Sequence, residues 1–183
     1  MHKLFVHEYL YFMYHTACVC YFSFTFDVIW SLPLRDVVFD FQMSEYSLPY
    51  IGFTDGASRS TRNLASATWA IYAPTNELIS LWGICLGWAT NNITEYSAVV
   101  ELLVDVISLG IRHLVVRLDS QLVVLQLSNV YSIRSPTLLR IYLRIHLLEW
   151  YFDHIKYQHI PRCLNTLTDA LANYVLDRHL NHL

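Results

Sequence analysis

The sequence predicts an α/β protein with a mixed five-stranded sheet, three antiparallel strands followed by parallel ones, flanked by helices. Between residues 50 and 88, three strand-like segments follow one another with short turns, a pattern typical of an antiparallel meander. From residue 98 onward the apolar residues recur at helical spacing, and short strands then alternate with helices. Such alternation favours parallel strand pairing through right-handed crossovers.

The meander is expected to consist of strands over residues 50–55, 67–73 and 78–88. The first strand should end at Asp55-Gly56, because this dipeptide often interrupts a strand. Pro74-Thr75-Asn76 is expected to form the turn between the second and third strands.

The second half is expected to alternate helices and strands. The helical pattern contains Ala98, Val99, Leu102, Val106 and Leu109, and Gly110 caps its C-terminus. A strand should follow over residues 113–118, and Ser120 should cap a helix that runs to about residue 126.

Three further elements complete the predicted order. Ser135-Pro136 opens a helix that runs to about residue 151, since proline is favoured in the first helical turn. A fifth strand is expected over residues 155–160. Asn165 or Thr166 should then cap a last helix that contains Asp169.

The domain is expected to span residues 47–183, preceded by an aromatic extension and linker over residues 1–46. A chain of 183 residues fits one domain of ordinary size with an extension, and all five glycines lie between Gly52 and Gly110. The segment from Tyr9 to Phe26 contains no Asp, Glu, Lys or Arg, so a marginal membrane span or a signal-peptide core stays open. His15 and the abundant tyrosines argue against both, and a membrane role is not expected.

Charge and cysteine content narrow the function classes. The net charge of −3 argues against broad electrostatic binding of nucleic acid, so such a partner would need local contacts or metal. The four cysteines show no Cys-x-x-Cys pair, which argues against a zinc site. A reducing, intracellular location, cytoplasmic or nuclear rather than secreted, is therefore expected.

Four carboxylates stand where the chain passes from one predicted element to the next: Asp55, Glu95, Asp119 and Asp169. The first and fourth strands can lie side by side and parallel, which would make Asp55 and Asp119 neighbours at the carboxyl ends, where open α/β sheets bind ligands. Acids that meet at one point repel one another unless a cation intervenes. A divalent metal is therefore the first hypothesis and phosphate chemistry the second.

Each acid also has an ordinary structural interpretation that the residues alone leave open. Asp55 precedes a glycine and fits a turn, and Asp119 fits a strand–helix loop. Asn92-x-x-Glu95 fits a capping box, in which Glu95 would accept a backbone N–H. Asp169 would complement a helix dipole, an effect worth about 0.3–1 kcal/mol.

The segments around these acids resemble a type 1 ribonuclease H domain, of the kind found in plant retrotransposon polyproteins and their cellular relatives. The resemblance covers residues 50–180, roughly 70% of the chain, in the order typical of the family. The matching segments are Thr54-Asp55-Gly56-Ala57-Ser58, Thr90-Asn91-Asn92-Ile93-Thr94-Glu95-Tyr96, Asp119-Ser120-Gln121-Leu122-Val123, and His159-Ile160-Pro161-Arg162-Cys163-Leu164-Asn165 leading to Asp169-Ala170-Leu171-Ala172-Asn173.

The resemblance implies a ribonuclease H-like fold and an endonuclease that cuts the RNA strand of RNA–DNA hybrids. It implies that the four acids bind two Mg²⁺ ions about 3.5–4 Å apart, with Mn²⁺ as a substitute and Asp55 between the two ions. It assigns proton transfer or product release to His159, ten residues before Asp169. Contacts to the hybrid are assigned to Asn91, Asn92, Ser120 and Gln121, although helix capping is the competing role for the two asparagines.

The sequence departs from the family pattern in two ways. No glycine occurs between Arg59 and Thr68, and the basic substrate-binding extension of some members is missing. These departures favour a second hypothesis, a catalytically silent nucleic-acid-binding or scaffolding domain derived from a retroelement. Residues 1–46 match nothing in the domain and would be either a disordered extension or a polyprotein remnant, with other retroelement polyprotein domains as expected partners.

Overall fold

The structure is a computed structural model that describes residues 48–59, 61 and 63–180. The predicted extension over residues 1–46, with its segment from Tyr9 to Phe26, lies outside the described residues. Within the described ranges, no helix is long and apolar enough to cross a membrane.

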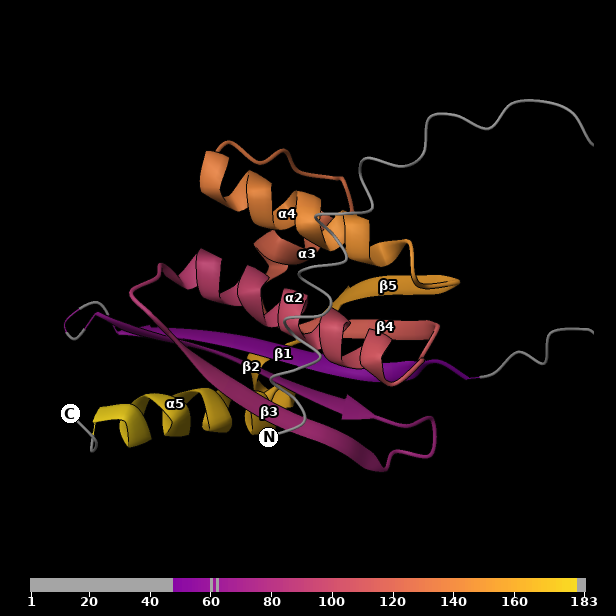
Figure 1. Ribbon diagram of the computed structural model, residues 1–183, viewed down its shortest axis with the longest axis horizontal. Helices are drawn as coiled ribbons and strands as arrows, with labels where there is room; N and C mark the ends of the chain where they lie inside the picture. The colour runs from indigo at the N-terminus through magenta and orange to yellow at the C-terminus, as the bar shows by residue number, and fades with distance from the viewer. Residues whose placement is uncertain (1–47, 60, 62, 181–183) are drawn as a thin grey trace, which may run out of the picture. The chain divides into compact units, whose positions relative to one another are not determined.

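Five strands form one sheet in the order β3-β2-β1-β4-β5 (Figure 1). The β1–β2 and β2–β3 pairs are antiparallel, and the β1–β4 and β4–β5 pairs are parallel, as predicted. The strands are β1 (Tyr50–Arg59), β2 (Leu64–Tyr72), β3 (Leu78–Gly87), β4 (His113–Leu118) and β5 (His154–His159).

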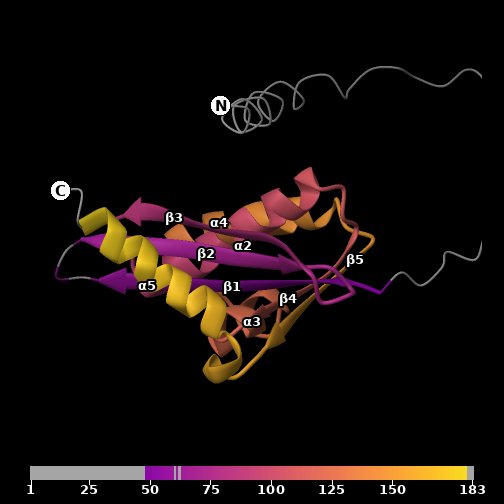
Figure 2. The same ribbon diagram turned by 90° about the horizontal axis from the view of Figure 1, so that it is seen from below.

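Helices cover both faces of the sheet. Figures 1 and 2 show α2, α3 and α4 on one face and α5 on the other, beneath β1, β2 and β3. The helices are α2 (Asn91–Ser108), α3 (Gln121–Leu127), α4 (Pro136–Glu149), the short 3₁₀ helix η2 (Arg162–Leu164) and α5 (Thr166–Leu180).

The prediction that β1 ends at Asp55-Gly56 is wrong. The strand continues to Arg59, because its antiparallel partner β2 begins at Leu64 and pairs with it as far as Arg59. The second strand therefore starts three residues before its predicted boundary at residue 67. The acid thus lies inside a long strand, and the turn interpretation of Asp55 is excluded.

The start of α2 also differs from the sequence prediction. Thr90 is the N-cap, and its Oγ1 accepts a hydrogen bond from the Ile93 backbone N–H at 3.4 Å. Because the helix begins at Asn91, Glu95 lies in its second turn and is buried. The capping-box interpretation of Asn92-x-x-Glu95 is therefore wrong, and the Glu95 carboxylate is left for another role.

Other predicted boundaries are confirmed. The strand over residues 113–118 is β4. Gly110 follows α2 with a φ of 72°, the left-handed conformation that favours glycine at a helix C-terminus. Ser120 precedes α3 as its N-cap residue, but its side chain makes no capping hydrogen bond.

The core lies between the sheet and the three helices on its first face. The buried side of α2 packs against β1, β2 and α4, and it includes Leu102, Leu103 and Val106, which are fully buried. Tyr96 is also fully buried, and its hydroxyl donates to Gln126 Oε1 of α3 at 2.9 Å. The N-terminal turns of α2 are thereby fixed relative to α3 and the sheet.

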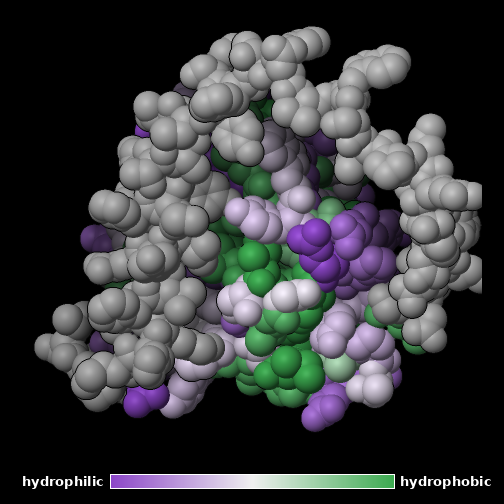
Figure 3. Space-filling view, turned by 45° about the vertical axis from the view of Figure 1, so that its right-hand side comes forward, coloured by the Kyte–Doolittle hydropathy of each residue, from purple (hydrophilic) through white to green (hydrophobic). Residues whose placement is uncertain are grey.

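Part of the surface is apolar. Figure 3 shows hydrophobic residues gathered in the middle of one face, with hydrophilic residues beside them. On α4, the side chains of Leu139, Leu143 and Leu147 are between 42% and 52% exposed. This surface agrees with a composition in which only 15% of residues are charged.

At Gly56, the backbone of β1 comes very close to the backbone of α2. A Cβ atom placed there would lie 2.5 Å from the Glu95 backbone nitrogen and 2.5 Å from the Thr94 carbonyl carbon. At Gly52 a Cβ atom would meet the Leu102 side chain, with Cδ2 at 2.6 Å. Backbone atoms cannot move away as a side-chain end can, so the two glycines tolerate substitution differently.

We expect Gly56→Ala to lower the free energy of unfolding by about 1–3 kcal/mol or more, because β1 must move away from the start of α2. Gly52→Ala, the matched control, should cost clearly less, since Leu102 can change rotamer. Urea denaturation followed by circular dichroism measures both values. Equal losses in the two variants would contradict the proposed backbone contact.

Candidate metal centre

Asp55 and Asp119 meet because β1 and β4 are parallel neighbours. The pairing places Phe53 opposite Arg117, and two further residues along each strand lead to Asp55 and Asp119. Residues two apart in a strand lie on the same face, so both acids follow their strands onto one side of the sheet. The predicted proximity of these two carboxylates is confirmed.

Glu95 reaches the same point from α2. One carboxylate oxygen from each of Asp55, Glu95 and Asp119 lies within 4.8 Å of the others. Asp55 and Glu95 are only 4% and 5% exposed, and Asp119 is half-buried. The missing side chain at Gly56 gives the backbone of Glu95 the room for this approach.

Burial and neighbouring negative charges raise the pKa values of Asp55 and Glu95. Burial, followed by the charges of Asp119 and Asp169, raises the pKa of Asp55 to about 7. Burial, followed by the charges of Asp55 and Asp119, raises the pKa of Glu95 to about 9. Without a cation, protons must neutralise part of the cluster at neutral pH.

The cluster fits a hard divalent cation. Carboxylate oxygens are the ligands preferred by Mg²⁺, Ca²⁺ and Mn²⁺. Glu95 Oε2 is buried and has no hydrogen-bond partner in the described part of the chain, which is costly for a polar atom and is relieved by a metal ligand bond. Asp55, Glu95 and Asp119 therefore have the donor set and the unmet bonding capacity of a metal site.

Asp169 lies beside this cluster rather than within it. It is in the first turn of α5, and its Oδ1 accepts a hydrogen bond from Nη2 of Arg162 in an ion pair. Its charge raises the pKa of Asp55, so it acts electrostatically on the three-acid group. Arg162 is the principal cation there, since its charge opposes the raised pKa values of Asp55 and Glu95.

Asn165 connects α5 to the cluster of Asp55, Glu95 and Asp119, which we call the metal centre. The sequence prediction missed this role. Its Nδ2 donates to the Thr54 carbonyl oxygen at 2.9 Å and lies 3.5 Å from Asp119 Oδ1. Its Oδ1 accepts from Thr168 Oγ1 at 2.6 Å. Asn165 was expected only as a helix cap, and the available signal was its place in the segment that leads to Asp169.

Arg162 is a second residue whose position was missed. It stands in the segment that follows β5, and nothing in the spacing of the chain indicated that it would face Asp169. The structure places it next to the acids because η2 turns the chain back from β5 toward α5.

The other predicted site residues border the acids. His159 is the exposed last residue of β5 and pairs with Leu118, which precedes Asp119. Asn91 and Asn92 are exposed in the first turn of α2, one turn before Glu95. Ser120 and Gln121 directly follow Asp119 at the start of α3, with Gln121 exposed and Ser120 partly so.

Comparison with known proteins places this arrangement in a family. A family model described as "Reverse transcriptase-like" matches residues 53–175. Ribonuclease HI of Halobacterium salinarum is 35% identical over 125 residues, which are 68% of this chain and 63% of that protein. The bifunctional protein Rv2228c of Mycobacterium tuberculosis is 39% identical over 92 residues, and this match spans only 25% of the mycobacterial protein.

Solved structures agree in fold. The crystal structure of RNase H1 from Halobacterium salinarum has a TM-score of 0.69 and 34% identity, covering 71% of this chain and 98% of that one. LC11-RNase H1 in complex with an RNA/DNA hybrid has a TM-score of 0.68 and 29% identity, covering 72% and 99%. The carboxylates, the strand order and these matches together show that the chain belongs to the reverse transcriptase-like family of type 1 ribonuclease H domains.

Proposed function

We propose that this chain is a metal-dependent endonuclease that hydrolyses the RNA strand of RNA–DNA hybrids. The observation that carries the proposal is the buried cluster of Asp55, Glu95 and Asp119, with an unpartnered oxygen on Glu95. A structural relative at 29% identity was solved in complex with an RNA/DNA hybrid, which supports this substrate class.

Two Mg²⁺ ions are the proposed cofactor, with Mn²⁺ as a substitute. Asp55, Glu95 and Asp119 would hold them, and Asp169 would join when Arg162 releases it. Asp55 is the natural shared ligand, since it is electrostatically coupled to the other three acids. Bound ions of this kind lower the pKa of an attacking water and stabilise the charge on a leaving oxygen.

The surrounding residues would bind the hybrid and move protons. His159 is exposed and pairs with Leu118, the residue before Asp119, and it is the proposed group for proton transfer or product release. The side chains of Asn91, Asn92, Ser120 and Gln121 border the acids and offer donors and acceptors to the 2′-hydroxyls of an RNA strand. Each of these assignments is a role proposed for this chain.

The proposed context is a retroelement protein. The Prototype Foamy Virus protease-reverse transcriptase shares the fold at 18% identity, so it supports the architecture alone. Other polyprotein domains are proposed partners, and the location is proposed to be cytoplasmic or nuclear.

A second candidate is a catalytically silent domain that binds nucleic acid or serves as a scaffold. The observation that favours it is the sparse positive charge, with 12 Lys and Arg against 15 Asp and Glu. A silent domain has no need to bind Mg²⁺, so metal binding separates the two candidates.

We expect wild-type protein with Mg²⁺ to cut the labelled RNA strand of a hybrid. Asp119→Asn should lower the rate more than about a hundredfold, because even the outer partners of metal ligands contribute 10–100-fold. Asp177→Asn, which removes an exposed carboxylate paired with Arg59, is the control and should cut normally. An intact hybrid at high wild-type concentration, with Mg²⁺ and with Mn²⁺, would exclude the enzyme.

Mg²⁺ should stabilise the folded domain. At a concentration of 100 times the dissociation constant, binding to the folded state alone adds about 2.7 kcal/mol to the free energy of unfolding. Thermal melting with Mg²⁺ and with EDTA measures the effect, and Asp119→Asn should reduce it. A wild-type melting temperature that does not respond to Mg²⁺ would favour the silent domain.

In EDTA, the free energy of unfolding should fall as the pH rises from about 4 to about 9. The pKa values of Asp55 and Glu95 are raised to about 7 and about 9, above the values near 4 of unfolded chains. The folded state then binds more protons, so this stabilisation is complete below pH 4 and is lost as the pH rises through each folded pKa.

Urea denaturation across this pH range tests the prediction. Glu95→Gln should flatten the upper part of the profile, because its amide does not titrate. A wild-type profile in EDTA that is flat between pH 5 and 9 would mean that the two carboxyls are not perturbed in this way.

A further inference from the structure

A cavity lies beside the metal centre, on the face of the sheet that α5 covers. It measures about 260 Å³ and is open to solvent. One wall consists of Phe53 of β1, Tyr72 of β2 and Arg117 of β4. The other consists of Leu164, Asn165 and Leu167, where η2 leads into α5. None of the proposed roles of the metal centre uses this cavity.

The strand register places the cavity next to the catalytic acids. Phe53 and Arg117 are paired residues, and each lies two positions before an acid of the metal centre, Asp55 within β1 and Asp119 directly after β4. Residues two apart share a face of the sheet, so the cavity wall continues directly into the carboxylates. Asn165 joins the two sites, since it lines the cavity and also approaches Asp119.

Arg117 gives the cavity a positive charge. Its guanidinium carbon lies 5.7 Å from the centre of the Phe53 ring, and its Nε donates to Gln158 Oε1 at 3.1 Å. Among the described residues, its two terminal nitrogens donate no hydrogen bond, and it forms no ion pair. The residues that line the cavity include no Asp or Glu. A half-buried guanidinium without an anion is a ready partner for phosphate.

The remaining walls are aromatic and apolar. Phe53 and Tyr72 pack edge to face with their centroids 5.5 Å apart, and both are partly exposed. Leu164 and Leu167 are 64% and 40% exposed, although both are large apolar side chains. One cation beside an aromatic and apolar wall matches the two parts of a nucleotide, its phosphate and its base.

We propose that this cavity is a nucleotide subsite, in which Arg117 binds a phosphate and the apolar wall takes the adjoining base. Its occupant is one nucleotide of a single strand of nucleic acid, and that strand continues past the metal centre. The identity of that strand rests on the proposed function, whereas the binding itself does not. The subsite would provide a local binding contact for nucleic acid in a protein whose net charge is −3.

The test measures binding in EDTA, where no metal-dependent cleavage takes place. The probe is a fluorescent single-stranded oligonucleotide of about ten thymidines, a length within the range of single-strand sites. Arg117→Gln should weaken its binding about tenfold and reduce the slope of log affinity against log salt by about 0.7, the value for one phosphate contact on a single strand.

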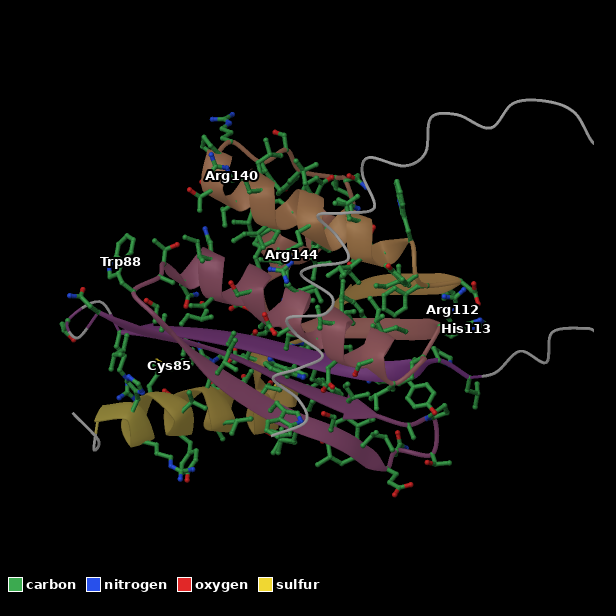
Figure 4. The ribbon with its side chains drawn as sticks, viewed as in Figure 1. Cys85, Trp88, Arg112, His113, Arg140 and Arg144 are labelled. Atoms are coloured by element: carbon green, nitrogen blue, oxygen red, sulfur yellow. The ribbon has the colours of Figure 1, made fainter. Side chains whose placement is uncertain are left out.

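The matched control is Arg144→Gln. Arg144 is an exposed arginine on α4, on the opposite side of the sheet from α5 (Figure 4). It should change the affinity by less than twofold. Leu164→Ser tests the apolar wall at an exposed position, where folding is not at risk, and should weaken binding without changing the salt slope.

Three results would overturn the subsite: no binding by wild-type protein, equal effects of Arg117→Gln and Arg144→Gln, or equal competition by inorganic phosphate and thymidine monophosphate. The last result would reveal a bare anion site without a place for the base. Cleavage of a hybrid by wild-type protein is measured separately, so an inactive protein that binds through Arg117 would refute the proposed function alone.

Discussion

The mutual repulsion of buried carboxylates is the constraint on which the domain depends. Asp55, Glu95 and Asp119 bring oxygens within 4.8 Å of one another where water is largely excluded. Burial raises the pKa values of Asp55 and Glu95, and the charges of neighbouring acids raise both values further. Such a cluster persists in a folded protein because the surrounding packing holds it together and because protons or cations neutralise it. The electrostatic repulsion is therefore greatest at the point where a bound cation would neutralise it.

The fold holds these acids from three directions. The parallel β1–β4 pair supplies two of them, and α2 delivers the third through the gap at Gly56. On the other face of the sheet, buried hydroxyls fix α5: Ser66 Oγ donates to the Ala172 carbonyl at 2.9 Å and Thr68 Oγ1 donates to the Thr168 carbonyl at 3.0 Å. Asn165 completes the attachment, since it reaches Thr54 and Asp119 from the start of α5. A small movement of α5 would therefore change the contact between Asn165 and Asp119.

Two arginines near the acids would have different roles in binding a polyanion. Arg162 pairs with Asp169 and offsets the charge of the metal centre. Arg117 of β4 lies over the Phe53 ring and has no anionic partner among the described residues. Among the described residues, Arg162 is the one cation whose charge lowers the pKa values of both Asp55 and Glu95, so a nucleic acid would be held at a small number of points. Local contacts of this kind agree with a net charge of −3.

The sequence by itself determined the order of the elements and the family, and it singled out four acids, three of which cluster in the structure. Local patterns carry this information: the helical period that includes Ala98 and Leu102, the strand over residues 113–118 and Gly110 after α2. Local patterns failed at Asp55-Gly56 and at Asn92-x-x-Glu95, where turn and cap chemistry predicted a break and a capping box. Pairing with β2 carried β1 onward, and the Thr90 cap moved Glu95 into the second turn. Only the tertiary structure decided that Asp169 pairs with Arg162, that Asn165 contacts Asp119 and that Arg117 faces a cavity, because these contacts join residues distant in the chain through strand register and the placement of α5.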